Sequence, residues 1–143
     1  MSGKIVIAID GPAASGKSST AKRVAKLLGY RHVDSGSLYR AATAAVIRGH
    51  DQDDWTEEDV VKAAGSVSLK AAEGGFVPLL EGKECDDELR GSAVTGSVSR
   101  VAQMNSVRDW VNDQVRSAGR EFNVVVDGRD IGTVVFPDAK LKI

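Results

Sequence analysis

A chain of 143 residues, 42% hydrophobic and 27% charged, has the length and composition of one soluble globular domain. Its 19 basic and 20 acidic residues give a net charge of -1, which provides no global field for nucleic acid or an anionic membrane. We therefore expect neither partner, and any anion must bind at a local site. The single cysteine, Cys85, excludes an internal disulfide and fits a reducing cytoplasm.

The N-terminal residues predict a strand, a glycine-rich loop and a helix in succession. Ile5 to Ile9 is a continuous apolar run rich in β-branched residues, typical of a strand buried on both faces of a parallel sheet. The run is too short to span a membrane. From Lys17 onward, apolar residues recur at helical spacing as far as Leu28, and Gly29 follows where a left-handed C-cap belongs.

The next segments continue the alternation of strands and helices. Residues 32–34 are expected to form a short second strand, and the apolar residues from Leu38 to Ala45 mark an amphipathic helix that Gly49 closes. Another helix begins near Thr56, whose hydroxyl can cap it, and the acidic residues that follow face the positive end of the helix dipole. This alternation predicts an α/β fold.

Residues 66–87 depart from this pattern. Short apolar segments at 67–70 and 76–80 are separated by Gly74-Gly75, which predicts a small antiparallel hairpin insert. Because proline cannot donate a main-chain hydrogen bond, Pro78 favours an edge strand.

Four further elements follow the insert: helices over residues 92–104 and 106–118, and strands over residues 124–126 and 141–143. Trp110 belongs to the apolar face of the second of these helices. We expect one domain over residues 1–143, of the three-layer α/β/α class with a parallel sheet, and the antiparallel insert within it.

Residues 11–18, GPAASGKS, fit the phosphate-loop pattern G-x-x-x-x-G-K-[ST] between a predicted strand and a predicted helix. In such a loop the main-chain amides point at a phosphate, Lys17 reaches the β- and γ-phosphates, and the Ser18 hydroxyl binds Mg²⁺. The alternative is a turn that merely connects strand to helix, but a chance turn need not place Lys-Ser at the helix start. We predict a P-loop NTPase fold and NTP binding by Gly11, Pro12, Ala13, Ala14, Ser15, Gly16, Lys17, Ser18 and Ser19.

The loop does not identify what receives the phosphoryl group, because unrelated activities share it. Two further segments, DSGSLYR at 34–40 and DGRD at 127–130, follow predicted strands, where α/β sheets place ligand-binding loops. Asp127 could orient Mg²⁺ through water or simply cap the strand end. Ser35 could be an N-cap and Arg40 a surface charge. Whether Tyr39 packs on a ligand or in the core stays open, and the two histidines lack metal-ligand spacing and receive no role.

The segments GPAASGKS, DSGSLYR, SRVA, VRDW and DGRDIGTVVFPDAKLKI, in this order, resemble bacterial cytidylate kinases over essentially the whole chain. The resemblance implies ATP-dependent phosphorylation of CMP or dCMP in the cytoplasm, with Mg²⁺. It makes residues 66–87 part of the CMP-binding region. It also implies catalytic roles for Lys17, Arg40 and Arg129, and a CMP site formed by Ser35, Arg40 and Arg129 at the phosphate end and by Ser99, Arg108 and Asp130 at the base.

Two consequences of the resemblance are open to test. Members of the family continue past Ile143 through an arginine-bearing lid, another strand and a closing helix, and the full-length form is expected to be a monomer. The alternative functions are a kinase for another nucleoside monophosphate and a nucleotide-binding fragment without turnover.

Overall fold

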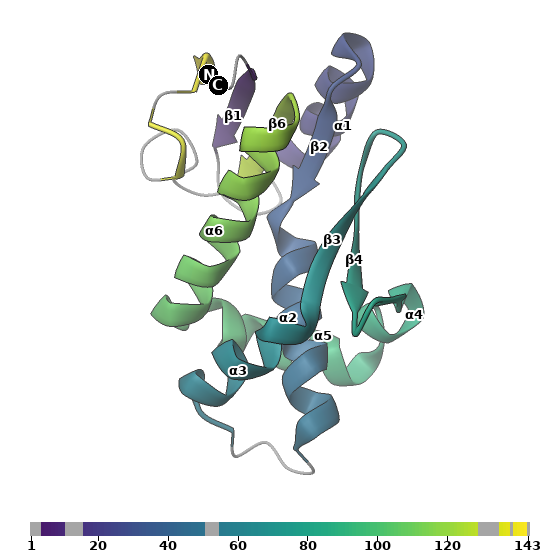
Figure 1. Cartoon of the computed structure of the whole chain (residues 1–143), viewed down its shortest axis with the longest axis vertical. Helices are drawn as coiled ribbons and strands as arrows, with labels where there is room; N and C mark the ends of the chain where they lie inside the picture. Colours follow the sequence, from purple (N-terminus) through teal and green to yellow (C-terminus); the bar gives the residue numbers. More distant parts are fainter. Residues whose placement is uncertain (1–3, 11–15, 51–54, 129–134, 138, 143) are drawn as a thin grey trace. The chain divides into compact units, whose positions relative to one another are not determined.

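The computed structural model describes residues 4–10, 16–50, 55–128, 135–137 and 139–142 (Figure 1). The chain forms two compact units. The first consists of Met1–Ser35, Ala71–Phe76 and Asn112–Ile143, and the second of Gly36–Lys70 and Val77–Val111.

A parallel sheet with the strand order β2-β6-β1-β7 forms the first unit. Its strands are β1 (Val6–Asp10), β2 (Arg31–Asp34), β6 (Val124–Gly128) and β7 (Leu141–Lys142). The expected parallel sheet is thus confirmed. Ile7, Val33 and the valines of β6 are buried because strands covered on both faces must be apolar throughout.

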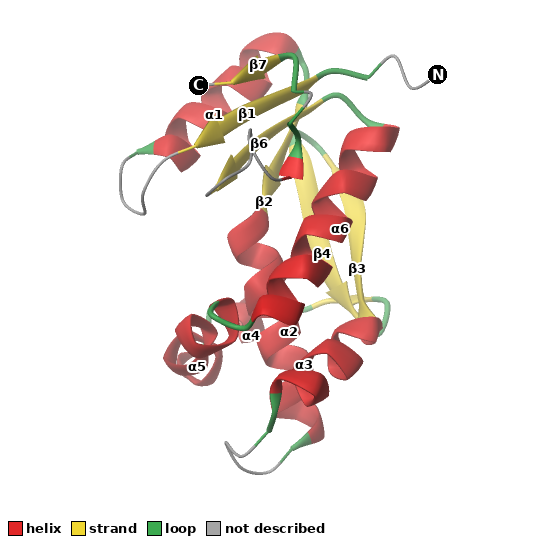
Figure 2. Ribbon diagram, turned by 90° about the vertical axis from the view of Figure 1, so that its left-hand side faces the viewer, coloured by secondary structure: helices red, strands yellow, loops and turns green. Residues whose placement is uncertain are grey.

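One face of this sheet packs against α1 (Lys17–Leu28) (Figure 2). A core cluster of buried residues joins the two layers: Ile7, Ile9, Ala21, Ala25 and Val125. The alanines let the helix approach the sheet closely. Gly29 ends the helix with a φ of 71° and donates its main-chain N–H to the Lys26 carbonyl, which confirms the predicted left-handed C-cap.

The opposite face of the sheet packs against the C-terminal part of α6 (Asn105–Glu121). A Cβ atom placed on Gly119 would lie 2.8 Å from the Phe136 ring and 3.4 Å from the Val6 side chain, so only a hydrogen fits there. Val6 and Ile7 point to opposite faces because strand side chains alternate. Helices therefore cover both faces of the sheet, which is the expected three-layer arrangement.

The second unit is mostly helical. Its elements are α2 (Ser35–Gly49), α3 (Glu57–Ala63), the 3₁₀ helix η1 (Ala64–Ser66), α4 (Asp86–Leu89) and α5 (Ser92–Ala102), together with the first part of α6. Helix α2 buries a run of small side chains around Leu38 and Val46, so neighbouring elements can approach it closely. Trp55 is buried, and the Arg100 guanidinium carbon lies 3.7 Å from the centroid of its ring.

A second, antiparallel sheet has the order β3-β4-β5, formed by β3 (Val67–Ala72), β4 (Gly75–Leu80) and β5 (Lys83–Glu84). The predicted antiparallel insert is confirmed, but the prediction of an edge strand for the segment with Pro78 is wrong. β4 lies in the middle because β5 pairs with its other side, and the two-residue β5 is too short to have a sequence pattern of its own. Pro78 is tolerated since β5 pairs only with Leu79 and Leu80. Glu81 and Gly82, with φ of 50° and 80°, form the tight turn between these strands.

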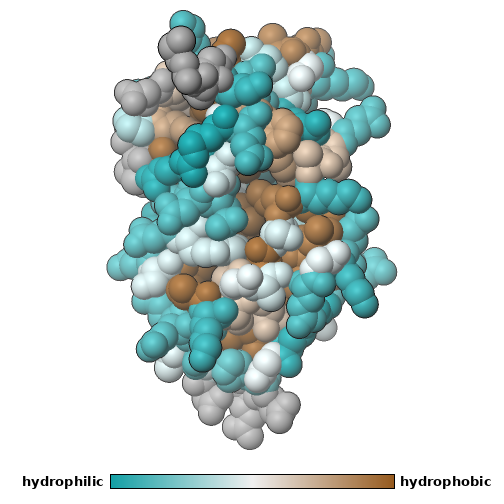
Figure 3. Space-filling model, viewed as in Figure 1, coloured by the Kyte–Doolittle hydropathy of each residue, from teal (hydrophilic) through white to brown (hydrophobic). Residues whose placement is uncertain are grey.

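Hydrophilic residues cover most of the face drawn in Figure 3, and hydrophobic residues gather there in smaller patches. The large hydrophobic residues exposed in the described part of the chain are Leu27, Leu28 and Leu141. Within that part, no helix is both long and apolar enough to cross a membrane.

Thr56 and Asp59 form the capping box at the start of α3. The Asp59 main-chain N–H donates to the Thr56 hydroxyl at 3.2 Å, and the Thr56 N–H donates to the Asp59 carboxylate at 2.8 Å. We expect Thr56→Ala to lower the free energy of unfolding by about 1 kcal/mol, because one helix N–H loses its partner. Urea denaturation measures this, and Thr56→Ser is the control that keeps the hydroxyl. Equal stability of the alanine and serine variants would contradict the role of the cap.

Candidate functional site

The carboxyl ends of three strands meet at one edge of the parallel sheet. Asp127 of β6 is in register with Ile9 of β1 on one side and with Asp34 of β2 on the other. In α/β proteins this edge is where loops bind ligands. The phosphate-loop motif follows β1 and the DSGSLYR segment follows β2, so both predicted segments begin at this edge.

The phosphate-loop motif occupies the connection between β1 and α1. Gly16 caps α1 with φ of 81° and ψ of 5°, a left-handed conformation that explains the glycine. Its carbonyl accepts from the Thr20 N–H at 3.1 Å, the first helical hydrogen bond. Ser19 is exposed in the first turn. Residues 11–15 and the side chains of Lys17 and Ser18 lie outside the described part, so their predicted roles stay predictions.

Asp127 is the buried carboxylate of this edge, with 7% of its surface exposed. The Nε2 atom of His32, itself 6% exposed, contacts Asp127 Oδ1. The Ser35 hydroxyl donates to the Asp127 main-chain carbonyl at 3.4 Å. His32 of β2 thus contacts the side chain of Asp127, and Ser35, the first residue of α2, contacts its main chain. Arg129 and Asp130, which follow Asp127, are outside the described residues.

In the second unit, the guanidinium of Arg40 is held by neutral acceptors. One of its nitrogens, NH1, donates to the Leu89 carbonyl and to the Thr95 hydroxyl, both at 3.1 Å. Leu89 ends α4 and Thr95 lies in the first turn of α5, so these two helix ends orient the Arg40 side chain. Neither partner carries charge, and the positive charge of Arg40 is left uncompensated by its described partners.

Tyr39 and Arg108 are brought together in the same unit. Burial raises the pKa of the Tyr39 hydroxyl, and the charge of Arg108 and its hydrogen bond to Tyr39 partly oppose that rise. The Tyr39 hydroxyl thereby contacts the guanidinium of Arg108, a residue that is exposed. Ser99 is exposed on α5. No described contact joins Ser99, Arg40 and Arg108 to one another, so their shared role in a CMP site stays a prediction.

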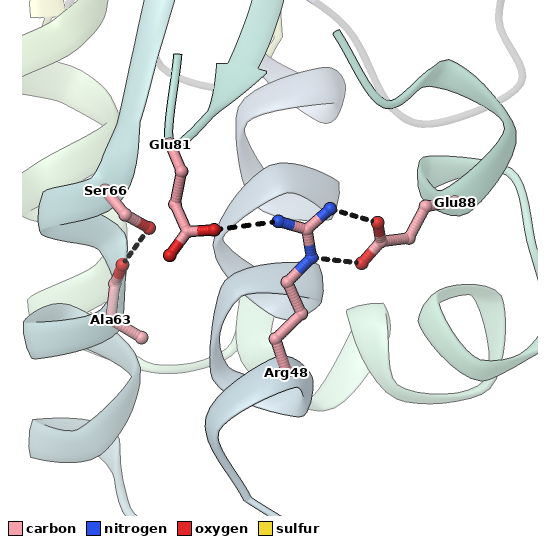
Figure 4. Close-up of polar contacts among 5 residues, drawn as sticks. All are labelled: Arg48, Ala63, Ser66, Glu81 and Glu88. Atoms are coloured by element: carbon pink, nitrogen blue, oxygen red, sulfur yellow. Dashed lines mark hydrogen bonds and ion pairs between the residues drawn. The ribbon is translucent and has the colours of Figure 1, made fainter. Parts of the chain in front are cut away.

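A second arginine of α2 forms an ion-pair cluster that the sequence did not reveal (Figure 4). Arg48 donates from Nε to Glu88 Oε2 at 2.8 Å and from NH2 to Glu88 Oε1, and it also reaches Glu81 Oε2 at 3.4 Å. Glu88 directly precedes Leu89, whose carbonyl Arg40 contacts, so both arginines of α2 bond to α4.

Sequence analysis missed His32, Thr95 and Glu88 for a common reason. Each contacts its partner across a large separation along the chain, such as the 95 positions between His32 and Asp127. The alternation of strand side chains could have suggested that His32 and Asp34 face the same side of the sheet. The identity of the neighbouring strand, however, is set by the order of the sheet and not by local sequence.

Comparison with known proteins places the chain among relatives of one kind. Its residues 7–143 match the family model described as cytidylate kinase. It is 44% identical over 142 residues to the cytidylate kinase of Pelodictyon phaeoclathratiforme, covering 98% of this chain and 61% of that protein. It is 43% identical to the enzymes of that name from Chloroherpeton thalassium and Geobacillus kaustophilus, over 141 and 144 residues. These alignments cover 98% and 100% of this chain and 60% and 64% of the two relatives.

The Arg48–Glu88 pair predicts a pH-dependent contribution to stability. Hydrogen bonding to Arg48 holds the pKa of Glu88 below its ordinary value. The contribution is therefore present above the unfolded-state pKa of about 4.3 and is lost as the pH falls through the lower folded-state pKa. We expect Glu88→Gln to lower the free energy of unfolding at pH 7 by at most about 1 kcal/mol, because the pair is partly exposed.

Denaturation of the wild type and the Glu88→Gln variant from pH 7 down to about pH 3 measures this effect. The control is Glu84→Gln, which removes the same charge from an exposed residue of β5. A difference between wild type and Glu88→Gln that stays constant over this range would contradict the ion pair.

Proposed function

The chain belongs to the cytidylate kinase family, and on that premise we propose that the protein transfers the γ-phosphoryl group of ATP to CMP or dCMP. The products are ADP and CDP or dCDP. The observation that carries the proposal is the phosphate-loop motif GPAASGKS between β1 and α1. It lies in a chain whose residues 7–143 match this family. We propose a monomeric, cytoplasmic enzyme whose substrates are small nucleotides.

On the ATP side, residues 11–19 bind the phosphates. The helix that begins at Lys17 directs its positive end toward them, and the left-handed Gly16 supports the tight curvature that such a loop needs. Lys17 contacts the β- and γ-phosphates and is catalytic, because its cationic charge stabilises the phosphoryl group in transfer.

Mg²⁺ fits the donor set that the chain offers. Asp127 is a buried carboxylate at the end of β6, beside the strand that leads into the phosphate loop, and oxygen ligands of this kind suit Mg²⁺. Ser18 and Asp127 would hold the ion, directly or through water, and the bound ion would neutralise charge on the phosphates. No group of three or more potential metal ligands occurs in the described residues. This agrees with an ion held largely by substrate phosphates and water.

On the acceptor side, Arg40 and Arg129 bind the phosphate of CMP. The described geometry supports Arg40 in this role: its guanidinium is oriented by the Leu89 carbonyl and the Thr95 hydroxyl, yet neither partner neutralises it. A fixed cation can hold an acceptor phosphate in line with the γ-phosphoryl group, which lowers the barrier through positioning. The acceptor oxygen is already ionised at neutral pH, so the reaction needs no general base.

Recognition of the base would distinguish cytosine from uracil. We propose that the Asp130 carboxylate accepts from the exocyclic N4 amine of cytosine, while Arg108 donates to its N3 or O2 acceptors and Ser99 adds a polar contact. The Tyr39 hydroxyl that bonds to Arg108 supports a fixed orientation of this guanidinium. Uracil would place its O4 acceptor against the Asp130 carboxylate, leaving two acceptors opposed.

Parallel assays with CMP, dCMP, UMP and AMP test the proposed reaction. We expect CDP and dCDP to form from ATP, with kcat/KM for UMP at least about fivefold lower than for CMP, because an unpaired buried acceptor costs at least about 1 kcal/mol. Product formation is measured directly by ion-exchange chromatography. Equal use of UMP or AMP would indicate a kinase for another monophosphate. Saturable binding of ATP and CMP without any product would indicate a nucleotide-binding module.

Removal of the Lys17 charge tests the role of the phosphate loop. We expect Lys17→Ala to lower turnover of CMP on the order of 10³-fold, the scale seen when a cation that stabilises phosphoryl transfer is lost. The matched control is Lys22→Ala, which removes the same charge from an exposed position of the same helix. Near-normal turnover by Lys17→Ala, with Lys22→Ala also unaffected, would refute the assignment.

A further inference from the structure

We propose that His32 is a positioning residue that orients the Asp127 carboxylate for binding hydrated Mg²⁺, by donating a hydrogen bond from Nε2 to Oδ1. The inference rests on the proposed function, since it concerns the ion that accompanies ATP. Its direct basis is the contact of two buried side chains, with 6% of His32 and 7% of Asp127 exposed.

The sheet places these two residues together. In the parallel pair of β2 and β6, His32 is in register with Val125, while Asp127 is in register with Asp34. His32 and Asp127 are therefore diagonal neighbours two positions apart, with their side chains on the same face. A register shift by one residue would turn one of them to the other face and break the contact. The contact is thus fixed by the same pairing that places Asp127 at the ligand-binding edge.

The chemistry of the contact assigns the proton. An ionised carboxylate accepts hydrogen bonds and cannot donate them, and it is costly to bury without a donor. In the described part of the chain, the side-chain donor to Asp127 is His32, so Nε2 carries hydrogen. The Ser35 hydroxyl donates to the main-chain carbonyl of Asp127 and not to its carboxylate.

Within the described residues, this arrangement uses Oδ1 of Asp127, and none of their hydrogen bonds goes to Oδ2. The imidazole is a rigid ring, and its hydrogen bond to Oδ1 restricts rotation of the Asp127 side chain. Outer partners that orient a metal-binding group in this way commonly change metal affinity by 10- to 100-fold. A histidine that only filled space beside β6 would not affect Mg²⁺ in this manner.

Two substitutions distinguish a positioning role of His32 from a role in packing alone. His32→Gln keeps an N–H donor on a side chain of similar reach, whereas His32→Leu keeps much of the apolar volume but has no donor. Calorimetric titration of ATP into the whole chain, with and without Mg²⁺, gives the increase in affinity that Mg²⁺ provides. We expect His32→Leu to need roughly tenfold more Mg²⁺ than wild type for half of this increase. We expect His32→Gln to remain close to wild type, and all three proteins to bind metal-free ATP alike.

The outcomes distinguish the inference from the proposed function. A folded His32→Leu protein with the Mg²⁺ dependence of wild type overturns the role of His32 and leaves the kinase proposal intact. Equal losses of metal-free and Mg²⁺-dependent binding in His32→Leu indicate a structural role alone and also overturn it. Wild-type protein that binds no ATP overturns the proposed function, and the inference with it.

A spectroscopic test does not require that a His32 variant folds. The chain has two histidines, so ¹⁵N-labelled imidazole resonances can be assigned by comparison of wild type with a His50→Gln variant. We expect the His32 ring to carry a proton on Nε2 that exchanges slowly with water, because it is buried and bonded to Asp127. A His32 ring with hydrogen only on Nδ1 overturns the assignment.

Discussion

The pairing of β6 between β1 and β2 is the constraint on which the site of the first unit depends. β1 and β6 bury apolar side chains on both of their faces, so the register between them is tightly specified, and β2 pairs with the other side of β6. That register brings the ends of β1 and β2 to Asp127. The phosphate-loop motif, the Ser35 hydroxyl and the contact between His32 and Asp127 all take their positions from it.

Much of this fold is local in origin, and the local part was predictable. The apolar run from Ile5 to Ile9 corresponds to β1 at Val6–Asp10, and the capping signal at Thr56 corresponds to the start of α3. Prediction failed where elements are too short to have a pattern of their own. Strand β5 has two residues and follows the turn at Glu81 and Gly82, and α4 has four residues, of which Glu88 pairs with Arg48.

The candidate site also has a part that local sequence predicts and a part that it does not. The phosphate-loop motif could be recognised because its residues are contiguous and its geometry is carried by one loop and one helix start. The partners of Arg40 could not, because Leu89 and Thr95 lie 49 and 55 positions away along the chain. His32 was given no role because it lacks metal-ligand spacing. Its position acquires chemical meaning only when the order of the sheet places β2 beside β6.

The two arginines of α2 show how a chain with a net charge of -1 can still offer a local cation to an anion. Arg48 is bonded to two carboxylates, Glu81 and Glu88, so its charge is compensated within the protein and its effect is structural. Arg40 has a carbonyl and a hydroxyl as its described partners, which fix its direction without cancelling its charge. A carbonyl and a hydroxyl carry no net charge, so they oppose the approach of an anion less than carboxylates do. Both arginines contact α4, Arg48 at Glu88 and Arg40 at Leu89. The residue type alone would have made these two arginines equivalent, and the charge of their partners distinguishes them.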